Sequence, residues 1–439
     1  MKNNFVLDAE EKIGIDIFLT KSKGTGGKLR FSPEDFFVKE ISKYPQEEQN
    51  GKYTIADITA VNWETNILIR EISKRLRISR NRISFAGTKD KRAKTTQLMS
   101  FYNVPAERIS KLNIKDVSLE NIYFSNKSVE IGDLVGNHFE IIIRNLREET
   151  NIKQINSIAS SILDVGGFPN FFGIQRFGVI RPITHVVGKN IVKGDLKKAV
   201  MSYIANPIKG ENDDAFMIRE KLQRDLDFNE ALKYYPRYLT FEKAILNKLV
   251  VKPDDFIGAI TELPKNLLTM FIYAYQSFLF NKILSERIKN NIPLNQAIIG
   301  DIVLPIRKGI IDQKNIKVKN NNINKVNKQI SNGKAVVSSI LIGCDSEFSN
   351  GKMGEIEHKI VEKEKIDPRD FIITDIPKIS SSGSRRGLLA TVKKLDYKMF
   401  ADDLNHGKNT LFLKFDLDKG SYATSLLREF MKTEDIRNY

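Results

Sequence analysis

Short runs rich in β-branched and aromatic residues recur through the first third of the chain, and this pattern is typical of strands. The runs predict strands over residues 28–31, 36–41, 53–58, 83–86 and 139–144. Between two of them, Thr65 is a candidate N-cap for a helix whose apolar residues follow at helical spacing. In the last strand, Phe139 should share one face with the isoleucines two and four positions later.

From about residue 168 onward the pattern changes to helices. Residues 267–288 are apolar nearly all round, which predicts a buried helix at the centre of a mostly helical domain. Polar residues interrupt this segment too often for a membrane span. In residues 314–334, Lys and Asn supply 13 of 21 positions, and this bias favours a solvated hairpin or a mobile loop.

The C-terminal segment is too short to fold alone. Residues 392–439 hold one clear strand, 411–417, and one clear helix, 423–431. Fewer than about 50 residues with two elements bury too little surface for a core, so they must pack on the strand-rich N-terminal part. We therefore expect one domain from residues 1–168 and 392–439, with 169–391 inserted as a second domain.

Charge and composition limit the function. The chain has 439 residues and a net charge of +16, which favours a polyanionic partner, although a lysine-rich proteome would give the same excess. One cysteine and four scattered histidines exclude an intramolecular disulfide framework and a thiolate zinc cluster, so we expect no structural metal. The acidic start lacks the apolar core of a secretion signal, and we expect a cytoplasmic protein without a membrane partner.

The most unusual stretch is 74–94, where a single acid, Asp90, stands among nine cations. The cations are Lys74, Arg75, Arg77, Arg80, Arg82, Lys89, Lys91, Arg92 and Lys94. An ionised carboxylate inside a basic surface suits a nucleophile that acts on a nucleic acid, because the cations attract the phosphates. A structural ion pair on a solvated loop is the alternative, and spacing alone does not separate the two.

Two further motifs combine polar groups with aromatic residues or turns. In PNFFGIQRFG, residues 169–178, three phenylalanines alternate with polar residues that include Arg176. Such a set can stack on RNA bases and hold phosphates, or the rings can fill a core. Asn137 follows a glycine at the start of a strand, where it could serve as a turn residue.

These motifs also carry a resemblance. FAGTKDKRAKTTQ, residues 85–97, closely resembles the signature of the TruD family of tRNA pseudouridine synthases, and the chain looks like an archaeal-type member. Further segments are similar to other motifs of that family, in the same order. They are LRFSPEDFFVKEI (29–41), GDLVGNHFEIIIR (132–144), PNFFGIQRFG (169–178), AYQSFLFN (274–281) and GSYATSLLREF (420–430).

The resemblance implies an α+β fold. One part would be a pseudouridine-synthase catalytic domain, which has a mixed, mostly antiparallel sheet and helices. The other would be a largely helical TruD insertion domain. The implied activity is the cofactor-free isomerisation of a tRNA uridine, most often U13, to pseudouridine. The implied partner is tRNA, and no protein partner is evident.

The resemblance also implies roles for individual residues. Asp90 matches the catalytic aspartate of the family. Asn137 would contact the target nucleotide, and Phe139 would pack against the uracil. Phe36 would lie at the substrate, and Tyr422 would stand beside the target base, where many relatives carry Phe.

The remaining expected substrate-binding residues are basic, acidic or aromatic. Arg30 would pair with Glu34 near the catalytic aspartate, although many relatives carry Lys where Arg30 stands. The other expected substrate contacts are Lys89, Phe172 and Arg176.

Two other classes of function remain to be weighed. A non-catalytic RNA-binding or RNA-folding protein could use the same basic and aromatic surface, and it would keep its function when Asp90 is replaced by Asn. An RNA methyltransferase would need a glycine-rich loop after a strand, and no convincing candidate occurs in the sequence.

Overall fold

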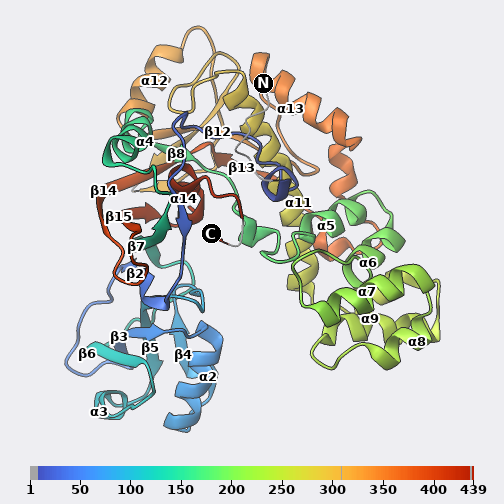
Figure 1. Ribbon diagram of the computed structural model, residues 1–439, viewed down its shortest axis with the longest axis horizontal. Helices are drawn as coiled ribbons and strands as arrows, with labels where there is room; N and C mark the ends of the chain where they lie inside the picture. Colours follow the sequence, from blue (N-terminus) through green and yellow to red (C-terminus); the bar gives the residue numbers. More distant parts are fainter. Residues whose placement is uncertain (1–7, 308, 436–437) are drawn as a thin grey trace. The chain divides into compact units, whose positions relative to one another are not determined.

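The computed structural model describes residues 8–307, 309–435 and 438–439 (Figure 1). It divides into two compact units. The sheet unit comprises residues 20–168 and 390–434 with 438–439, and the helical unit comprises residues 8–19 and 169–389 with 435. The fold is α+β, as predicted, because each unit combines helices with a largely antiparallel sheet.

A ten-stranded sheet forms the centre of the sheet unit, in the order β6-β3-β5-β2-β7-β15-β14-β8, with β1 on β7 and β4 on β5. The pairing of β2 with β5 is parallel, whereas β2 with β7 and β7 with β15 are antiparallel. The strands are β1 (Gly26–Lys28), β2 (Phe36–Ser42), β3 (Tyr53–Val61), β4 (Ile83–Phe85), β5 (Lys94–Tyr102), β6 (Val117–Ser125), β7 (Leu134–Leu146), β8 (Gly167–Pro169), β14 (Leu389–Ala401) and β15 (Asn409–Asp418).

Four α-helices accompany this sheet. They are α2 (Thr65–Leu76), α3 (Ala106–Ser110), α4 (Ile152–Val165) and α14 (Ala423–Met431), with short 3-10 turns η1 (Pro33–Asp35) and η2 (Arg80–Arg82). Helices α4 and α14 bury their apolar faces in one cluster with the inward residues of β7 and β15. Helix α2 packs in a second cluster over β3, β4 and β5.

The two ends of the chain share this sheet. Strand β15 pairs with β7 from Leu411 opposite Ile143 to Asp418 opposite Gly136. Phe139 and the two alternate isoleucines of β7 are buried together in the core, as their alternation predicts. The predicted strand 411–417 lies inside β15, and the predicted helix 423–431 coincides with α14. The C-terminal elements therefore complete a core that the N-terminal strands begin.

Three local predictions for the sheet unit were wrong. The strand expected over residues 28–31 is β1 at Gly26–Lys28, which shares only Lys28 with the prediction. The N-cap of α2 is Glu64, not Thr65, because the Glu64 carboxylate accepts hydrogen bonds from the Asn66 and Ile67 amides. Strand β14 was missed in a segment where one strand was expected. Its alternation is broken by a register shift between Lys393 and Asp396, so the period of two does not run through its sequence.

The helical unit is built around α11 (Lys265–Lys289), which contains the predicted central helix and buries most of its side chains. The other helices are α1 (Asp8–Glu11), α5 (Thr184–Val192), α6 (Leu196–Ile204), α7 (Asp213–Asp225), α8 (Phe228–Tyr234), α9 (Thr240–Val251), α10 (Phe256–Thr261), α12 (Ile323–Ser331) and α13 (Gly351–Glu364). A small sheet consists of β9 (Ile302–Arg307), β10 (Ile310–Ile311), β11 (Ile316–Lys317), β12 (Ala335–Leu341) and β13 (Ser384–Gly387).

The first described residues pack on α11. Asn281 donates a hydrogen bond of 3.0 Å to the carbonyl of Ile13, and Ser285 donates one of 3.0 Å to the carbonyl of Gly14. Ile13 is buried, as is Phe18. Residues 8–19 therefore group with the helical unit, whereas the sequence led us to expect them with the strand-rich part.

The Lys/Asn-rich tract is not the predicted hairpin or mobile loop, because it contains strand β11 and helix α12. Val318 and Val326 are buried. The Asn327 side chain accepts a hydrogen bond of 2.8 Å from the Ala297 amide and donates one of 3.1 Å to its carbonyl. A few well-spaced apolar residues and one bonded amide order a tract whose composition suggested a solvated loop.

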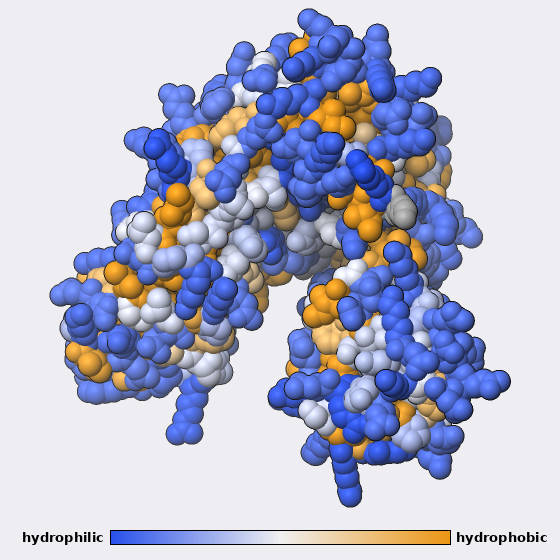
Figure 2. Space-filling view, turned by 180° about the vertical axis from the view of Figure 1, so that it is seen from behind, coloured by the Kyte–Doolittle hydropathy of each residue, from blue (hydrophilic) through white to orange (hydrophobic). Residues whose placement is uncertain are grey.

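One face of the molecule is largely polar. Hydrophilic side chains cover most of the face shown in Figure 2, with smaller apolar areas between them. No helix in the described part of the chain has the length and apolar character that crossing a membrane requires.

A buried histidine should make stability depend on pH. His185 on α5 stacks on Phe278 with 4.9 Å between ring centroids, and burial lowers the pKa of His185 to about 4. Because the unfolded chain takes up this proton near pH 6.5, the free energy of unfolding should fall by up to about 3 kcal/mol as the pH drops from about 6.5 to 4. Urea denaturation across this range measures the effect.

Two variants separate this contribution from other groups. His185→Gln should flatten the pH dependence of stability, whereas His406→Gln, at an exposed loop position, should leave it unchanged. An equal slope in the wild type and His185→Gln would contradict the assignment.

Candidate active site

The loop between β4 and β5 carries Asp90, and hydrogen bonds hold it on both sides of this residue. The Thr65 hydroxyl, at the start of α2, accepts a hydrogen bond of 2.8 Å from the Lys89 amide. On the other side, the Ala93 carbonyl accepts one of 3.0 Å from the Asn62 amide. The loop is therefore hydrogen-bonded to the β3–α2 connection and to the first residue of α2. The Thr65 hydroxyl accepts a bond from the loop and does not cap the helix.

The Asp90 carboxylate is accessible and has one bonded partner. Its side chain is 62% exposed, and Arg30 Nη2 donates to its Oδ2 at 2.7 Å. No other described side chain donates to this carboxylate. The Arg30 guanidinium lies over the Phe36 ring, 4.2 Å from the centroid, and the Arg30 side chain is only 16% exposed. The Phe36 ring thus holds the Arg30 guanidinium in place, and the guanidinium orients the Asp90 carboxylate.

Lys89, the residue before Asp90, points into the fold instead. Its ammonium pairs with Glu40 at 2.7 Å, and the two side chains are 8% and 2% exposed. It also donates a hydrogen bond of 3.1 Å to the side-chain oxygen of Asn137, which stands opposite Glu40 in the β2–β7 ladder. Glu40 in turn accepts from the Leu98 amide on β5 at 3.1 Å. One buried ion pair therefore connects the loop to three strands.

Three phenylalanine rings lie beneath these polar groups. Phe36 meets Phe139 edge to face with 6.4 Å between centroids, and Phe139 stacks on Phe415 at 5.2 Å. All three are buried. The three rings form a buried apolar cluster, and the Arg30 guanidinium packs on the Phe36 ring of this cluster.

Tyr422 comes from the C-terminal part of the chain. It is the half-buried N-cap residue of α14, five positions after Leu417, which pairs with Asn137. Gly420 makes the connecting turn with φ of 84°, a conformation that favours glycine, as its place in the motif suggested. The turn from β15 to α14 therefore begins beside Asn137 of β7.

The acidic partner expected for Arg30 differs in the structure. Glu34 is exposed on η1 and forms no ion pair with any described residue, whereas Arg30 pairs with Asp90. The neighbouring Asp35 is buried, where it accepts a hydrogen bond of 2.9 Å from the Ser32 amide and pairs with Arg144 at 2.9 Å. The turn between Arg30 and β2 is thus held by Asp35.

Sequence reasoning missed four residues that support the site: Thr65 as a loop contact, Asp35, Glu40 and Arg144. Burial alone would lower the pKa of Arg144, but hydrogen bonds to Asp35 and to two acids after β14 raise it. Glu40 did leave a signal, because it occupies an inward position of β2 in the alternation of Phe36 and Val38. An acid at such a position requires a buried partner.

Phe172 and Arg176 belong to the helical unit, and Asp90 with its partners belongs to the sheet unit. The Phe172 amide donates a hydrogen bond of 2.9 Å to Asn281 of α11, and the Arg386 guanidinium lies 4.2 Å from the Phe172 ring centroid. Arg176 lies over Tyr273 of the same helix at 5.9 Å. Two of the sequence motifs, 169–178 and 274–281, therefore pack on each other.

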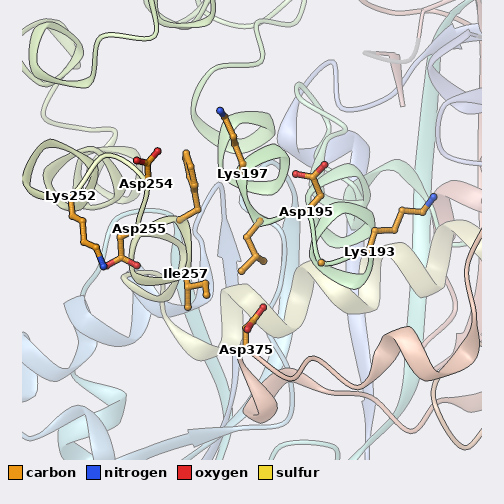
Figure 3. Close-up of a pocket in the computed structure, with 11 residues that line it drawn as sticks. Lys193, Asp195, Lys197, Lys252, Asp254, Asp255, Ile257 and Asp375 are labelled. Atoms are coloured by element: carbon orange, nitrogen blue, oxygen red, sulfur yellow. The ribbon is translucent and has the colours of Figure 1, made fainter.

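A cavity of about 670 Å³ in the helical unit contains none of the expected site residues (Figure 3). Residues at the start of α6 (193–197), residues at the start of α10 (252 and 254–257) and Asp375 line it. Two of the aspartates are helix caps, because Asp195 accepts a hydrogen bond from the Lys198 amide and Asp255 from the Gly258 amide. Among the described residues, no group of acids, histidines or cysteines is arranged to hold a metal ion.

Comparisons with known proteins match this chain along almost its whole length. A family model described as tRNA pseudouridine synthase D (TruD) matches residues 12–430. A probable tRNA pseudouridine synthase D of Methanococcoides burtonii is 44% identical and aligns with 99% of both chains. One of Thermococcus sibiricus is 37% identical over 94% of this chain and 97% of its own. The crystal structure of a putative tRNA pseudouridine synthase D from Methanosarcina mazei has a TM-score of 0.89 at 43% identity and covers 98% of each chain.

Removing the buried counter-charge of Lys89 should destabilise the sheet unit. We expect Glu40→Gln to lower the free energy of unfolding by about 3–5 kcal/mol, because it leaves a buried ammonium without a charged partner. Urea denaturation measures the change. The exposed Glu120→Gln on β6 is the control and should alter stability by less than about 0.5 kcal/mol. If both variants are as stable as the wild type, the ion pair does not hold the loop.

Proposed function

This chain belongs to the TruD family of tRNA pseudouridine synthases, and from that premise we propose that Asp90 is the nucleophile with which it isomerises U13 of tRNA. The observation that carries the proposal is the Asp90 carboxylate itself. It is exposed, lies on a loop bonded on both sides, and is oriented by Arg30. The enzyme class follows from the family, whereas the nucleophile and the position in tRNA are the proposal.

The reaction moves the uracil from N1 to C5 attachment without adding or removing a group other than a proton. Asp90 attacks C1′ of the ribose, or first removes a proton from C2′ to give a glycal, and the N-glycosidic bond breaks. The uracil then rotates and C5 bonds to C1′. In the first route the C1′–O bond to Asp90 breaks as C5 attacks, in the second the proton returns from Asp90 to C2′, and in both N1 takes up a proton from water. Loss of the C5 proton completes pseudouridine in both routes, so the hydrogen at C5 is released to water.

The surrounding residues suit this chemistry. The target uridine must leave its stack to reach Asp90, and an aromatic residue such as Tyr422 offsets part of that cost by stacking on the base. Because Lys89 occupies the side-chain oxygen of Asn137, the Asn137 amide presents its NH₂ group to a uracil carbonyl. The buried Phe36 ring packs on Phe139 and lies under the Arg30 guanidinium that meets Asp90.

The two units take different parts in this proposal. The sheet unit, which contains Asp90, Asn137 and Tyr422, serves as the catalytic domain, and the helical unit corresponds to the insertion of the family. Phe172 and Arg176 remain predicted tRNA contacts of that insertion. The cytoplasmic location also remains a prediction.

Tritium release from tRNA that carries [5-³H]uridine tests the nucleophile. Asp90→Asn should abolish release while it keeps the dissociation constant for tRNA within about twofold, because a neutral amide cannot attack C1′. The exposed Glu120→Gln should release tritium at the wild-type rate. Release by Asp90→Asn at the wild-type rate would contradict the role of Asp90.

A second substrate tests the position. A transcript with cytidine in place of U13 should release no tritium from the wild type. Release that persists from this transcript would move the target to another uridine. If the wild type binds several tRNAs but releases nothing from any of them, a non-catalytic RNA-binding role replaces the isomerase.

A further inference from the structure

The nine cations of residues 74–94 separate into two groups in the structure. Four of them are engaged inside the sheet unit. Arg75 donates to Glu71 at 2.7 Å, and Arg82 donates to the Tyr102 carbonyl at 2.9 Å. Lys89 forms the buried pair with Glu40, and Lys94 lies over the Phe37 ring at 5.6 Å. These side chains hold the fold together.

The other five are exposed and form no ion pair with a described residue. They are Lys74, Arg77, Arg80, Lys91 and Arg92. Arg70, also exposed, joins them from the middle of α2. The three acids of residues 62–94 are already occupied: Glu64 caps α2, Glu71 pairs with Arg75, and Asp90 pairs with Arg30. The charge of the exposed group is therefore not balanced locally.

Four of these cations follow one another from α2, the helix that lies beside β4 (Figure 1), through its C-cap to η2. Arg70 and Lys74 stand at i and i+4, so they share one face of α2, opposite the buried face that includes Leu68 and Ile72. Arg77 follows as the C-cap of the helix, with a left-handed backbone at φ of 52°. Arg80 follows directly on η2. We call Arg70, Lys74, Arg77 and Arg80 the α2 stripe.

Helix α2 begins against the loop that carries Asp90, and the α2 stripe follows farther along the helix. Thr65, the first residue of α2, bonds the Lys89 amide, so the helix starts against the loop that carries Asp90, Lys91 and Arg92. At 1.5 Å per residue, the helix axis extends about 18 Å from Thr65 to Arg77. Both the loop and the helix belong to the sheet unit, so this path is defined within one unit.

We propose that the α2 stripe binds backbone phosphates of the substrate tRNA at a distance from the target nucleotide. This inference rests on the proposed function only in taking tRNA as the substrate. Cations that meet phosphates supply affinity and register and carry no sequence information, so the stripe positions the tRNA without taking part in the chemistry.

Stabilisation of the helix dipole accounts for only part of the stripe. Cations near a helix C-terminus are favourable, and this explains Lys74 and Arg77 in the last turn and cap of α2. It does not explain Arg70, which lies near the middle of the helix, or Arg80, which lies beyond it. A polyanionic partner accounts for all four.

The test replaces the stripe with neutral residues of similar size. In R70Q/K74Q/R77Q/R80Q, the salt dependence of tRNA binding should weaken, with the slope of log K against log[salt] reduced in magnitude by about 3. The dissociation constant at low salt should rise at least about tenfold. The KM in tritium release should rise similarly, while kcat at saturating tRNA stays within about twofold of the wild type.

The helical unit offers a matched control. K352Q/K359Q/K363Q/K365Q also removes four exposed cations without ion pairs from one helix and its cap, and Lys365 has the same φ of 52° as Arg77. It should bind tRNA with the wild-type salt slope. An equal loss in both variants would show an effect of net charge alone and overturn the proposal, as would a stripe variant that binds like the wild type.

Two further measurements distinguish loss of phosphate binding from loss of folding or of arginine geometry. The thermal unfolding of the stripe variant shows whether α2 is intact, and R70K/R77K/R80K, which keeps the charges, should retain the wild-type binding. A comparable loss in that variant would overturn phosphate binding by charge. Binding is measured without turnover, so the outcome stands even if Asp90 proves not to be the nucleophile.

Discussion

The buried ion pair between Lys89 and Glu40 is the constraint on which the candidate site depends. A buried ammonium is tolerated only with a charged partner and further hydrogen bonds, and here Glu40 and Asn137 supply them. Because these partners lie on β2 and β7, the loop can keep this pair only in one position against the sheet. With Lys89 directed inward, the adjacent Asp90 remains at the surface, where a substrate can reach it.

Orientation of Asp90 needs a second set of contacts, which come from the segment before β2. Arg30 meets the carboxylate from a turn that begins with its own left-handed backbone, at φ of 55°, and its guanidinium rests on Phe36. The buried pair of Asp35 with Arg144 holds that turn against β7. The buried pairs Lys89–Glu40 and Asp35–Arg144 thus fix the positions of Asp90 and Arg30, which pair with each other at the surface.

The basic residues fall into two groups with different roles, and the net charge of the chain does not distinguish them. Cations with buried or backbone partners stabilise the sheet unit, whereas exposed cations without partners are available to a polyanion. A count of Lys and Arg treats the two groups alike. The partners of each side chain separate them, and these partners come from elements that are distant in the sequence.

The sequence by itself determined the local elements with regular periodicity, such as α14, β15 and the buried helix α11, because burial on one face imposes a repeat on neighbouring residues. It also singled out Asp90 as one acid among cations. Only the tertiary structure decided that Arg30 meets Asp90, that Lys89 meets Glu40, and that a Lys/Asn-rich tract folds as β11 and α12. The partner of a charge depends on strand register and loop position between segments far apart in the chain, and no local pattern encodes that register.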